Sequence, residues 1–366
     1  MRLIALHLSN VRNYAHLELE PSPGLNVFIG RNAQGKSNLL EAISMLGTGK
    51  SFRTSRERDL IREGLQLAAI SGEAEVRAGT VRLGCTIAAG VRGTRKMYAV
   101  NGQSVRYARF LGSLRVVTFV PADLLLAAGP PSGRRSFLNT ALAQEQKTYY
   151  HDLARYQKAL AQKAALLRSE GLIDEDLLAV YNETLVEAGT AIMLAREQFA
   201  GVLAPLAVRV HSQWTGGTEK LEMTYAPSVA FEVAAADAIA GAFTAQLREM
   251  RAIERARGMT LVGPHRDDLD LTLDGRSLAA YGSQGQQRTA VLALKVAEYS
   301  VMQERSGEAP LLLLDDVLSE LDPDRAAAFL QGVGAFEQAF ITATHLPENL
   351  GTARLYRIEN ASVSAL

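Results

Sequence analysis

The stretch Gly30-Arg31-Asn32-Ala33-Gln34-Gly35-Lys36-Ser37 fits the pattern G-x-x-x-x-G-K-[ST] without a mismatch. An apolar run at 25–29 precedes it, and residues 38–43 read as the start of a helix. The two fixed glycines let successive backbone N–H groups turn inward around phosphates, at a helix start where the dipole favours anions. Lys36 supplies positive charge to the β- and γ-phosphates, and the Ser37 hydroxyl is a ligand for Mg²⁺. The stretch therefore predicts binding of a nucleoside triphosphate with Mg²⁺.

A second motif lies near the other end of the chain. Leu311–Leu314 reads as a buried strand, and the carboxylates of Asp315 and Asp316 follow it directly. Because ligands gather at the carboxyl ends of parallel strands, we expect Asp315 to hold Mg²⁺, directly or through water. Asp316 is the candidate base for the attacking water, and with Lys36 it is the expected catalytic pair. The motifs are 279 positions apart (315 − 36), so both chain ends must build one site.

Composition excludes several classes of protein. The chain has 366 residues, 48% hydrophobic and 21% charged, which is typical of one or two globular domains. Cys85 is the only cysteine, so internal disulfides and cysteine-based zinc sites are excluded. No apolar run approaches the roughly 18 residues of a membrane span, and the first residues show no signal-peptide pattern. We expect a cytoplasmic protein with no membrane partner.

The chain changes character twice along its length. Short β-type runs dominate residues 1–134, helical spacing dominates 135–258, and mixed α/β patterns return over 259–366. We predict an α/β P-loop head built from both chain ends, with an inserted antiparallel helical arm domain at 135–258. In the arm we expect helices at 136–169, 174–211 (ended or kinked at Pro205) and 235–257 (ended at Gly258). In the head we expect a helix at 284–302 and strands at 2–8, 25–29, 67–76, 80–88, 96–100, 116–119, 268–273, 311–314 and 338–342.

The zero net charge hides an asymmetry. Residues 1–135 hold 19 basic and 9 acidic side chains, so residues 136–366 hold 20 basic (39 − 19) and 30 acidic (39 − 9). The balance of +10 in the first segment favours contact with a polyanion, although pairing with the acidic half is also consistent with it. Few aromatic residues lie among these arginines, which favours double-stranded DNA over stacking on single strands. The candidate DNA contacts are Arg53, Arg56, Arg92, Arg95 and Lys96.

Four further stretches carry a resemblance to a known family. Leu8-Ser9-Asn10-Val11-Arg12-Asn13-Tyr14 resembles the first-strand motif of chromosome-maintenance and Rad-fifty-type ATPase heads. Tyr281-Gly282-Ser283-Gln284-Gly285-Gln286-Gln287-Arg288 resembles the ABC-ATPase signature loop, L-S-G-G-Q. Asp315-Asp316-Val317-Leu318-Ser319-Glu320-Leu321-Asp322 resembles a Walker B strand that runs into a D-loop. The fourth stretch is Gly263-Pro264-His265-Arg266-Asp267-Asp268-Leu269. The four stretches, in the order in which the chain carries them, make it similar to the RecF family of bacterial recombination mediators.

The resemblance implies an ABC-type ATPase head that forms an ATP-dependent homodimer. Two subunits of such enzymes sandwich two ATP molecules, so the P-loop of one subunit faces the signature loop of the other. Residues 30–37 and Arg12 would bind ATP, although Arg12 is also consistent with a plain surface arginine. In trans, the γ-phosphate would be capped by Ser283, Gln284, Gly285 and Gln286. The resemblance gives D-loop roles to Ser319 and Asp322 and a switch role to His345, for which a surface histidine is an equal alternative.

Two departures from the family pattern bear on the ATPase rate. Gln284 replaces the first glycine of the signature, and Asp316 stands where most ABC enzymes carry glutamate. The aspartate is one methylene shorter, so slow hydrolysis, suited to a DNA-stimulated switch, is the hypothesis. The resemblance further implies binding of gapped or junction DNA, and help from RecR and RecO in loading RecA onto single strands coated by SSB. It implies a nucleoid-associated place in the cytoplasm.

Three other classes of protein remain as alternatives. A P-loop small-molecule kinase completes its site within one compact chain and has no use for a signature loop. A transporter ATPase subunit holds its P-loop and signature loop closer than the 253 positions found here (283 − 30). Another SMC-like structural head would carry a long coiled coil, and no heptad pattern extends far enough for one.

Overall fold

The computed structural model describes residues 1–91, 93–169, 173–317, 336–346 and 352–366. Its central sheet has the order β15-β14-β3-β13-β12-β8, and the four pairings from β14 to β8 are parallel. The strand that precedes the P-loop therefore lies between two strands from the far end of the chain. The strands are β3 (Gly24–Ile29), β8 (Val116–Phe119), β12 (Leu311–Asp315), β13 (Gln338–Ala343), β14 (Ala353–Glu359) and β15 (Ser362–Ala365).

A second sheet, antiparallel throughout, covers the central one. Its order is β2-β1-β4-β5-β6-β7, and the hairpin from β6 to β7 turns at Asn101 and Gly102, both with positive φ, as the Asn-Gly pair predicts. Helix α1 (Lys36–Thr48) packs against strands of both sheets and buries eleven of its residues. The strands are β1 (Arg2–Val11), β2 (Tyr14–Leu19), β4 (Leu67–Val76), β5 (Gly79–Gly90), β6 (Gly93–Val100) and β7 (Gln103–Val105).

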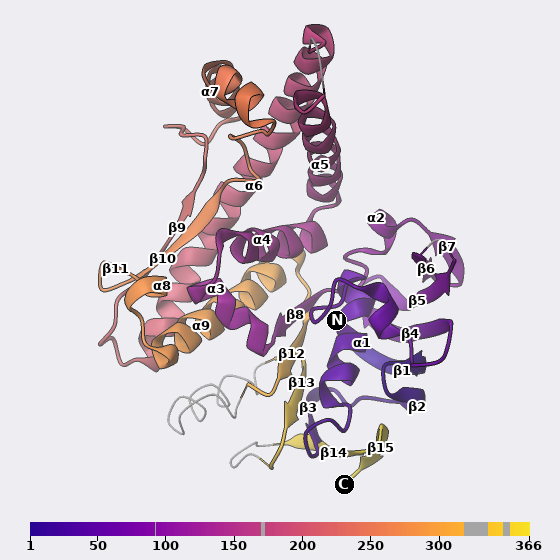
Figure 1. Cartoon of the computed structure of the whole chain (residues 1–366). Helices are drawn as coiled ribbons and strands as arrows, with labels where there is room; N and C mark the ends of the chain where they lie inside the picture. Colours follow the sequence, from indigo (N-terminus) through magenta and orange to yellow (C-terminus); the bar gives the residue numbers. More distant parts are fainter. Residues whose placement is uncertain (92, 170–172, 318–335, 347–351) are drawn as a thin grey trace.

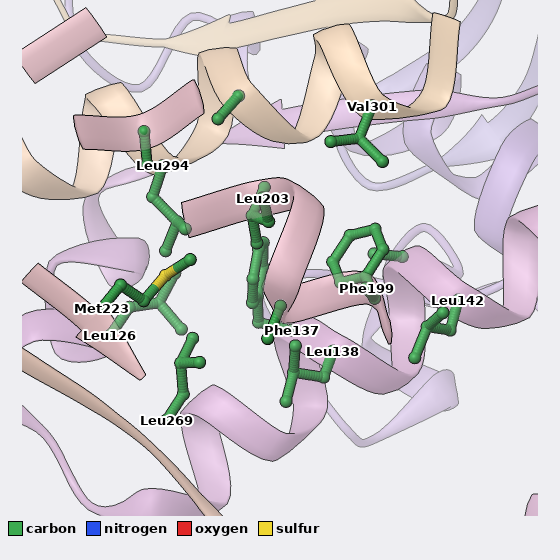
Figure 2. Close-up of a cluster of buried hydrophobic side chains, with 14 of the residues drawn as sticks. Leu126, Phe137, Leu138, Leu142, Phe199, Leu203, Met223, Leu269, Leu294 and Val301 are labelled. Atoms are coloured by element: carbon green, nitrogen blue, oxygen red, sulfur yellow. The ribbon is translucent and has the colours of Figure 1, made fainter. Parts of the chain in front are cut away.

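Helices from the middle of the chain form a second lobe, which extends above the central sheet in Figure 1. Its long helices are α4 (Pro131–Glu145), α5 (Lys147–Leu167), α6 (Glu175–Trp214) and α7 (Ala236–Arg257), which ends at Gly258 in the left-handed conformation as expected. Helix α9 (Gln284–Ser306) packs along α6. Figure 2 shows how this core interlocks side chains of α4 (Leu138, Leu142), α6 (Phe199, Leu203) and α9 (Leu294, Val301).

Short elements connect these layers. They are η1 (Glu57–Leu60), α2 (Tyr107–Phe110), η2 (Pro121–Leu124), α3 (Leu125–Ala128), α8 (Leu278–Tyr281) and a small sheet of β9 (Leu221–Ala226), β10 (Asp268–Leu273) and β11 (Arg276–Ser277).

The structure corrects two expectations for the arm. The predicted helix at 136–169 is wrong, because an extended backbone at Gln146 divides it into α4 and α5. The side chain of Gln144 explains the break: its Oε1 accepts from Val116 N at 2.9 Å and its Nε2 donates to Val116 O at 3.1 Å. These bonds fix the end of α4 on edge strand β8. Helix α6, moreover, does not end at Pro205 but runs through it to Trp214, since burial of Leu203 and Ala207 on either side outweighs one lost hydrogen bond; a kink at Pro205 stays a prediction.

Strand β9 went unpredicted, and it bears on the domain division. It pairs with β10 in antiparallel register, so residues 221–226 of the expected arm join residues 268–273 of the expected head in one sheet. The division at residue 259 stays a prediction, and this sheet crosses it. Among the described residues, α6 alone is long and apolar enough to span a membrane by length and composition. It packs against α5, α7 and α9, which is the behaviour of a core helix.

Candidate nucleotide-binding site

The P-loop connects β3 to α1 at the carboxyl edge of the central sheet. Gly35 caps α1 with a φ of 116°, a conformation that favours glycine. The Lys36 ammonium folds back over the loop and donates to the carbonyl oxygens of Gly30 (2.6 Å) and Arg31 (3.0 Å). Burial lowers the pKa of Lys36, and the charges of Asp316 and Asp315 oppose that shift. The lysine thus stands between the loop that would hold phosphates and the two acidic residues.

The structure brings Ser37 and Asp315 together from opposite ends of the chain. The Ser37 hydroxyl donates to Asp315 Oδ1 at 2.9 Å, and the Thr342 hydroxyl donates to the same oxygen at 2.8 Å. Burial raises the pKa of Asp315, while these two hydrogen bonds and the charge of Arg53 lower it. A buried carboxylate beside a hydroxyl is a donor set that suits Mg²⁺, which prefers oxygen ligands. Ser37 and Asp315 are therefore the residues that would hold the ion.

Asp316 has an unusual backbone at the end of β12. Its φ is 54°, in the left-handed region, and its N–H donates to Thr342 Oγ1 at 2.9 Å. Aspartate adopts this region at lower cost than most residues, and strained backbone often marks functional sites. Thr342 therefore fixes both acidic residues, through the side chain of Asp315 and the main chain of Asp316. Sequence reasoning missed its role, because a threonine within a buried strand carries no motif.

Two hairpins hold the P-loop from outside. From the β1–β2 turn, Asn13 Nδ2 donates to Gln34 O at 3.2 Å and Tyr14 OH donates to Gly35 O at 3.1 Å. From the β14–β15 turn, the N–H groups of Asn360 and Ala361 donate to Gln34 Oε1 (2.6 Å) and Gln34 O (3.1 Å). The loop therefore keeps its shape through contacts from both chain ends. The C-terminal turn gave no sequence signal.

Arg12 lies beside α1, where Glu41 engages it. Its Nε and Nη2 donate to the two carboxylate oxygens of Glu41, each at 2.8 Å, and its Nη1 donates to Asp59 O at 2.8 Å. Its role as an ATP contact stays a prediction. Arg53, an expected DNA contact, is exposed and donates to the side chain of Asn38 in the first turn of α1, and its role in DNA binding stays a prediction. Its position places it among the residues around the P-loop.

The signature loop begins α9 and faces solvent. Ser283 caps the helix: its hydroxyl accepts from Gln286 N at 3.2 Å, and its N–H donates to Gln286 Oε1 at 2.9 Å. Ser283 and Gln284 are exposed, and Gly285 is half-buried. Figure 1 places α8 and α9 on the opposite side of the central sheet from α1, so the structure does not bring this loop to its own P-loop. The N-terminus of this 23-residue helix carries the positive end of the helix dipole, which favours an anion there.

The remaining predicted residues are the switch and D-loop residues and the other DNA contacts. His345 is exposed just after β13, whereas Ser319, Asp322 and Arg92 lie outside the described residues. Of the predicted DNA contacts, Lys96 is half-buried and pairs with Glu57 at 2.7 Å. Arg56 and Arg95 are exposed, and neither has an ion pair within the described ranges.

The element Gly263–Leu269 forms a buried network rather than part of the P-loop site. Arg196 Nη1 lies 2.9 Å from Asp267 Oδ2 and 2.6 Å from Pro264 O, and both charged residues are fully buried. Arg134 pairs with both oxygens of Asp268, at 2.6 and 2.7 Å. His265 Nε2 lies 3.1 Å from Thr260 O, so it carries the hydrogen and Nδ1 accepts from Tyr156 OH at 2.6 Å. The network joins α4, α5 and α6 to the strand β10.

Comparisons with known proteins agree with this geometry. The family model for the RecF/RecN/SMC N terminal domain matches residues 2–362. The DNA replication and repair protein RecF of Symbiobacterium thermophilum is 45% identical over 99% of this chain and 98% of its own, and that of Geobacillus thermodenitrificans is 39% identical over 100% of both. A solved structure of the recombination mediator protein RecF with ATP, in the RecFOR pathway, superposes with a TM-score of 0.91 at 33% identity, covering 100% of this chain and 97% of that one.

A Smc head domain from Pyrococcus furiosus has a TM-score of 0.58 at 14% identity, covers 100% of this chain and 96% of its own, and shows the fold alone. The predicted ABC-type P-loop ATPase head fold is confirmed by these matches. They place the chain outside the metabolite kinases and the transporter subunits. The family model and the relatives together show that this chain belongs to the RecF family, within the RecF/RecN/SMC group.

Proposed function

We propose that this chain is an ATP-dependent DNA-binding protein of recombinational repair and replication restart, with slow hydrolysis as its switch. The observation that carries the proposal is the contact of Ser37 with Asp315 at 2.9 Å. It builds an ATP site from the two chain ends, while the signature loop lies elsewhere and exposed. The relatives' name, DNA replication and repair protein RecF, and the solved RecF structures with ATP support it.

In this proposal the P-loop carries ATP and the acidic strand end carries the chemistry. Lys36 exchanges its bonds to the loop carbonyls for the β- and γ-phosphates. Ser37 and Asp315 hold Mg²⁺, which supplies charge neutralisation on the phosphates when bound. Asp316 accepts a proton from the attacking water, and the bond of its main-chain N–H to Thr342 holds its backbone in place. A base shorter than glutamate and fixed through its main chain has little freedom to follow the water, which supports slow turnover.

The exposed signature loop supports a dimer that forms with ATP. Ser283 and the N–H groups at the start of α9 would donate to the γ-phosphate held by the other subunit. Gln284, in place of glycine, adds a side chain to the approach. Arg12 stays near the nucleotide through Glu41, and His345 would meet the phosphate from the end of β13.

DNA contact is assigned to the basic segment of the head. Arg56 and Arg95 are exposed and Lys96 lies beside them, so they can neutralise phosphates of duplex DNA at a gap or junction. With RecR and RecO, the dimer would promote loading of RecA onto single strands coated by SSB. The RecFOR pathway named for the solved relative supports this assignment, which would put the protein with the nucleoid in the cytoplasm.

The proposal is tested with Asp316→Asn and a fluorescent gapped duplex, by anisotropy with ATP and with ADP. Removal of the base should trap the ATP state, so we expect tight, salt-sensitive binding with ATP alone. Asp270→Asn, an exposed carboxylate on β10, is the matched control and should bind as the unaltered protein does. Failure to bind DNA with either nucleotide would refute the recombination assignment, while ATP binding measured in parallel would still report on the site itself.

A further inference from the structure

A cleft of about 990 Å³ lies between the two lobes, away from the P-loop. One wall comes from the C-terminal end of α1, the loop after it and β6, and the other comes from α4 and α5. Nothing in the proposed ATP or signature sites uses this cleft.

Two lysines mark the head wall of the cleft. Lys96 Nζ is bound by Glu57 (2.7 Å) and by the Gly49 carbonyl (2.9 Å). Lys50 has no carboxylate partner within the described part of the chain. Desolvation in the cleft and the charge of Lys96 lower the pKa of Lys50, so an anion placed here would relieve a repulsion between like charges.

Hydroxyl groups line the opposite wall at helical spacing. Ser132, Ser136 and Thr140 lie four residues apart along α4, all three are exposed, and all three line the cleft. The first turn of α4 contains no acidic residue, and Pro130 at its N-cap supplies no side-chain cap. Hydroxyls are groups that hold phosphodiester oxygens.

A tyrosine cluster closes the end of the cleft between these walls. The ring centroids of Tyr98 and Tyr107 lie 5.2 Å apart, and those of Tyr107 and Tyr150 lie 5.3 Å apart in an edge arrangement. All three tyrosines are half-buried and line the cleft. Their partly exposed rings offer faces on which bases stack. The sequence concealed this cluster, because its members come from β6, α2 and α5.

We propose that this cleft binds a single strand of nucleic acid, with phosphates on Lys50 and the α4 hydroxyls and bases against Tyr107 and Tyr150. Cations that follow the backbone and aromatic rings for the bases are the two features of single-strand sites. The cleft volume of about 990 Å³ lies at the upper end of the range of small-ligand pockets and has room for a few nucleotides. The proposal deepens the proposed function, since it places the unpaired strand of a gap, and it rests on that function for its biological role.

A short loop links the cleft to the ATP site. Lys50 and Ser51 line the cleft, and two residues further on Arg53 donates to Asn38 in the first turn of α1. Ser51 also donates to Glu41, the partner of Arg12. A strand that shifts this loop therefore moves side chains around the P-loop.

The test uses the full-length protein and a fluorescent dT12 oligonucleotide, without ATP, across a salt series. Lys50→Glu should weaken binding at least tenfold and reduce the salt slope by about 0.7, the value for one phosphate contact on a single strand. Tyr150→Ser should weaken it roughly 5- to 160-fold, the loss of about 1–3 kcal/mol for one stacked base. Lys158→Glu changes an exposed lysine elsewhere on α5 and is the matched control. It should weaken dT12 binding far less than either of these variants.

Cross-linking locates the strand directly. A dT12 that carries 5-iodouracil should cross-link to Tyr107 or Tyr150, and the Lys50→Glu variant should lose that product. Unchanged dT12 affinity in Lys50→Glu, or cross-links confined to the outer face of β6, would overturn the proposal. Binding of gapped duplex by Asp316→Asn with ATP reports on the proposed function separately, so loss of one result leaves the other interpretable.

Discussion

Ser37 donates to Asp315 at 2.9 Å across 278 positions of sequence, so the pair proposed to bind Mg²⁺ forms only when β12 has joined the sheet beside the P-loop. Thr342 completes the arrangement from β13, which lies between β3 and β12. The site is thus a property of the parallel sheet rather than of either motif.

Asp315→Asn should remove the Mg²⁺-dependent part of ATP binding. The amide keeps a hydrogen bond to Ser37 or Thr342 but loses the charge that attracts the cation. We expect ATP affinity in Mg²⁺ to fall at least tenfold, about 1.4 kcal/mol, with little change in EDTA. Titration of a fluorescent ATP analogue in both conditions measures this, with Asp270→Asn as control. Equal losses in the two conditions would mean that Asp315 acts on the fold instead.

Gly30→Ala should abolish ATP binding through the shape of the loop. A Cβ at Gly30 would overlap the carbonyl oxygen of Ile358, which cannot move without shifting β14. Gly201→Ala is the contrasting variant, since a Cβ on this part of α6 has nothing within 4 Å. It should keep ATP affinity and stabilise the protein by about 0.5–1 kcal/mol. Calorimetric titration and thermal unfolding distinguish the two, and an ATP-binding Gly30→Ala would refute the crowding argument.

His265 should make the stability depend on pH in the acid range. Burial lowers its pKa from 6.5 to about 4, so the native state resists protonation. Above pH 6.5 its contribution is complete, and it is lost as pH falls from 6.5 to 4, because only the unfolded chain gains the proton. The loss is on the order of 3 kcal/mol. His265→Gln should flatten this part of a pH series of urea unfolding, whereas exposed His151→Gln should leave the slope intact.

Arg196→Met should destabilise the protein by about 3–5 kcal/mol, because it leaves Asp267 buried and unpaired among Tyr225, Ser228 and the helices. Arg155→Met, a change on α5, removes the ion pair between Arg155 and Glu187. Glu187 lies on α6, as Arg196 does, but on the exposed face of that helix. That variant should unfold at the same denaturant concentration as the unaltered protein. Similar unfolding midpoints for both variants would contradict the role given to the buried network.

Local patterns allowed most of the ATP site to be predicted. The P-loop needs a strand, a glycine turn and a helix in succession, and the Leu311–Asp315 strand is apolar to its last residue, so both were visible. Thr342 and the turn at Asn360 were not visible, because their roles come from the order of strands in the sheet. The contact of Arg53 with Asn38 was not visible either, because it depends on how the loop after α1 folds back.

Tertiary contacts also explain the missed boundaries in the arm. Gln144 belongs to a continuous helical pattern, and only its bonds to Val116 in the other lobe account for the extended residue that follows it. Strand β9 alternates buried and exposed residues from Leu221 to Tyr225, a signal typical of a half-buried strand. Its six residues, between two long helical regions, were too short to outweigh the helical composition around them.

The position of β3 in the central sheet has a consequence for synthesis of the chain on the ribosome. Both of its neighbours, β13 and β14, belong to residues 338–359, so the strand that carries the P-loop stays unpaired until translation is almost finished. At roughly 5–20 residues per second, the 309 residues between Ile29 and Gln338 (338 − 29) take about 15–60 s to make. The nascent P-loop spends that interval without its sheet, and prematurely terminated chains never acquire a working nucleotide pocket.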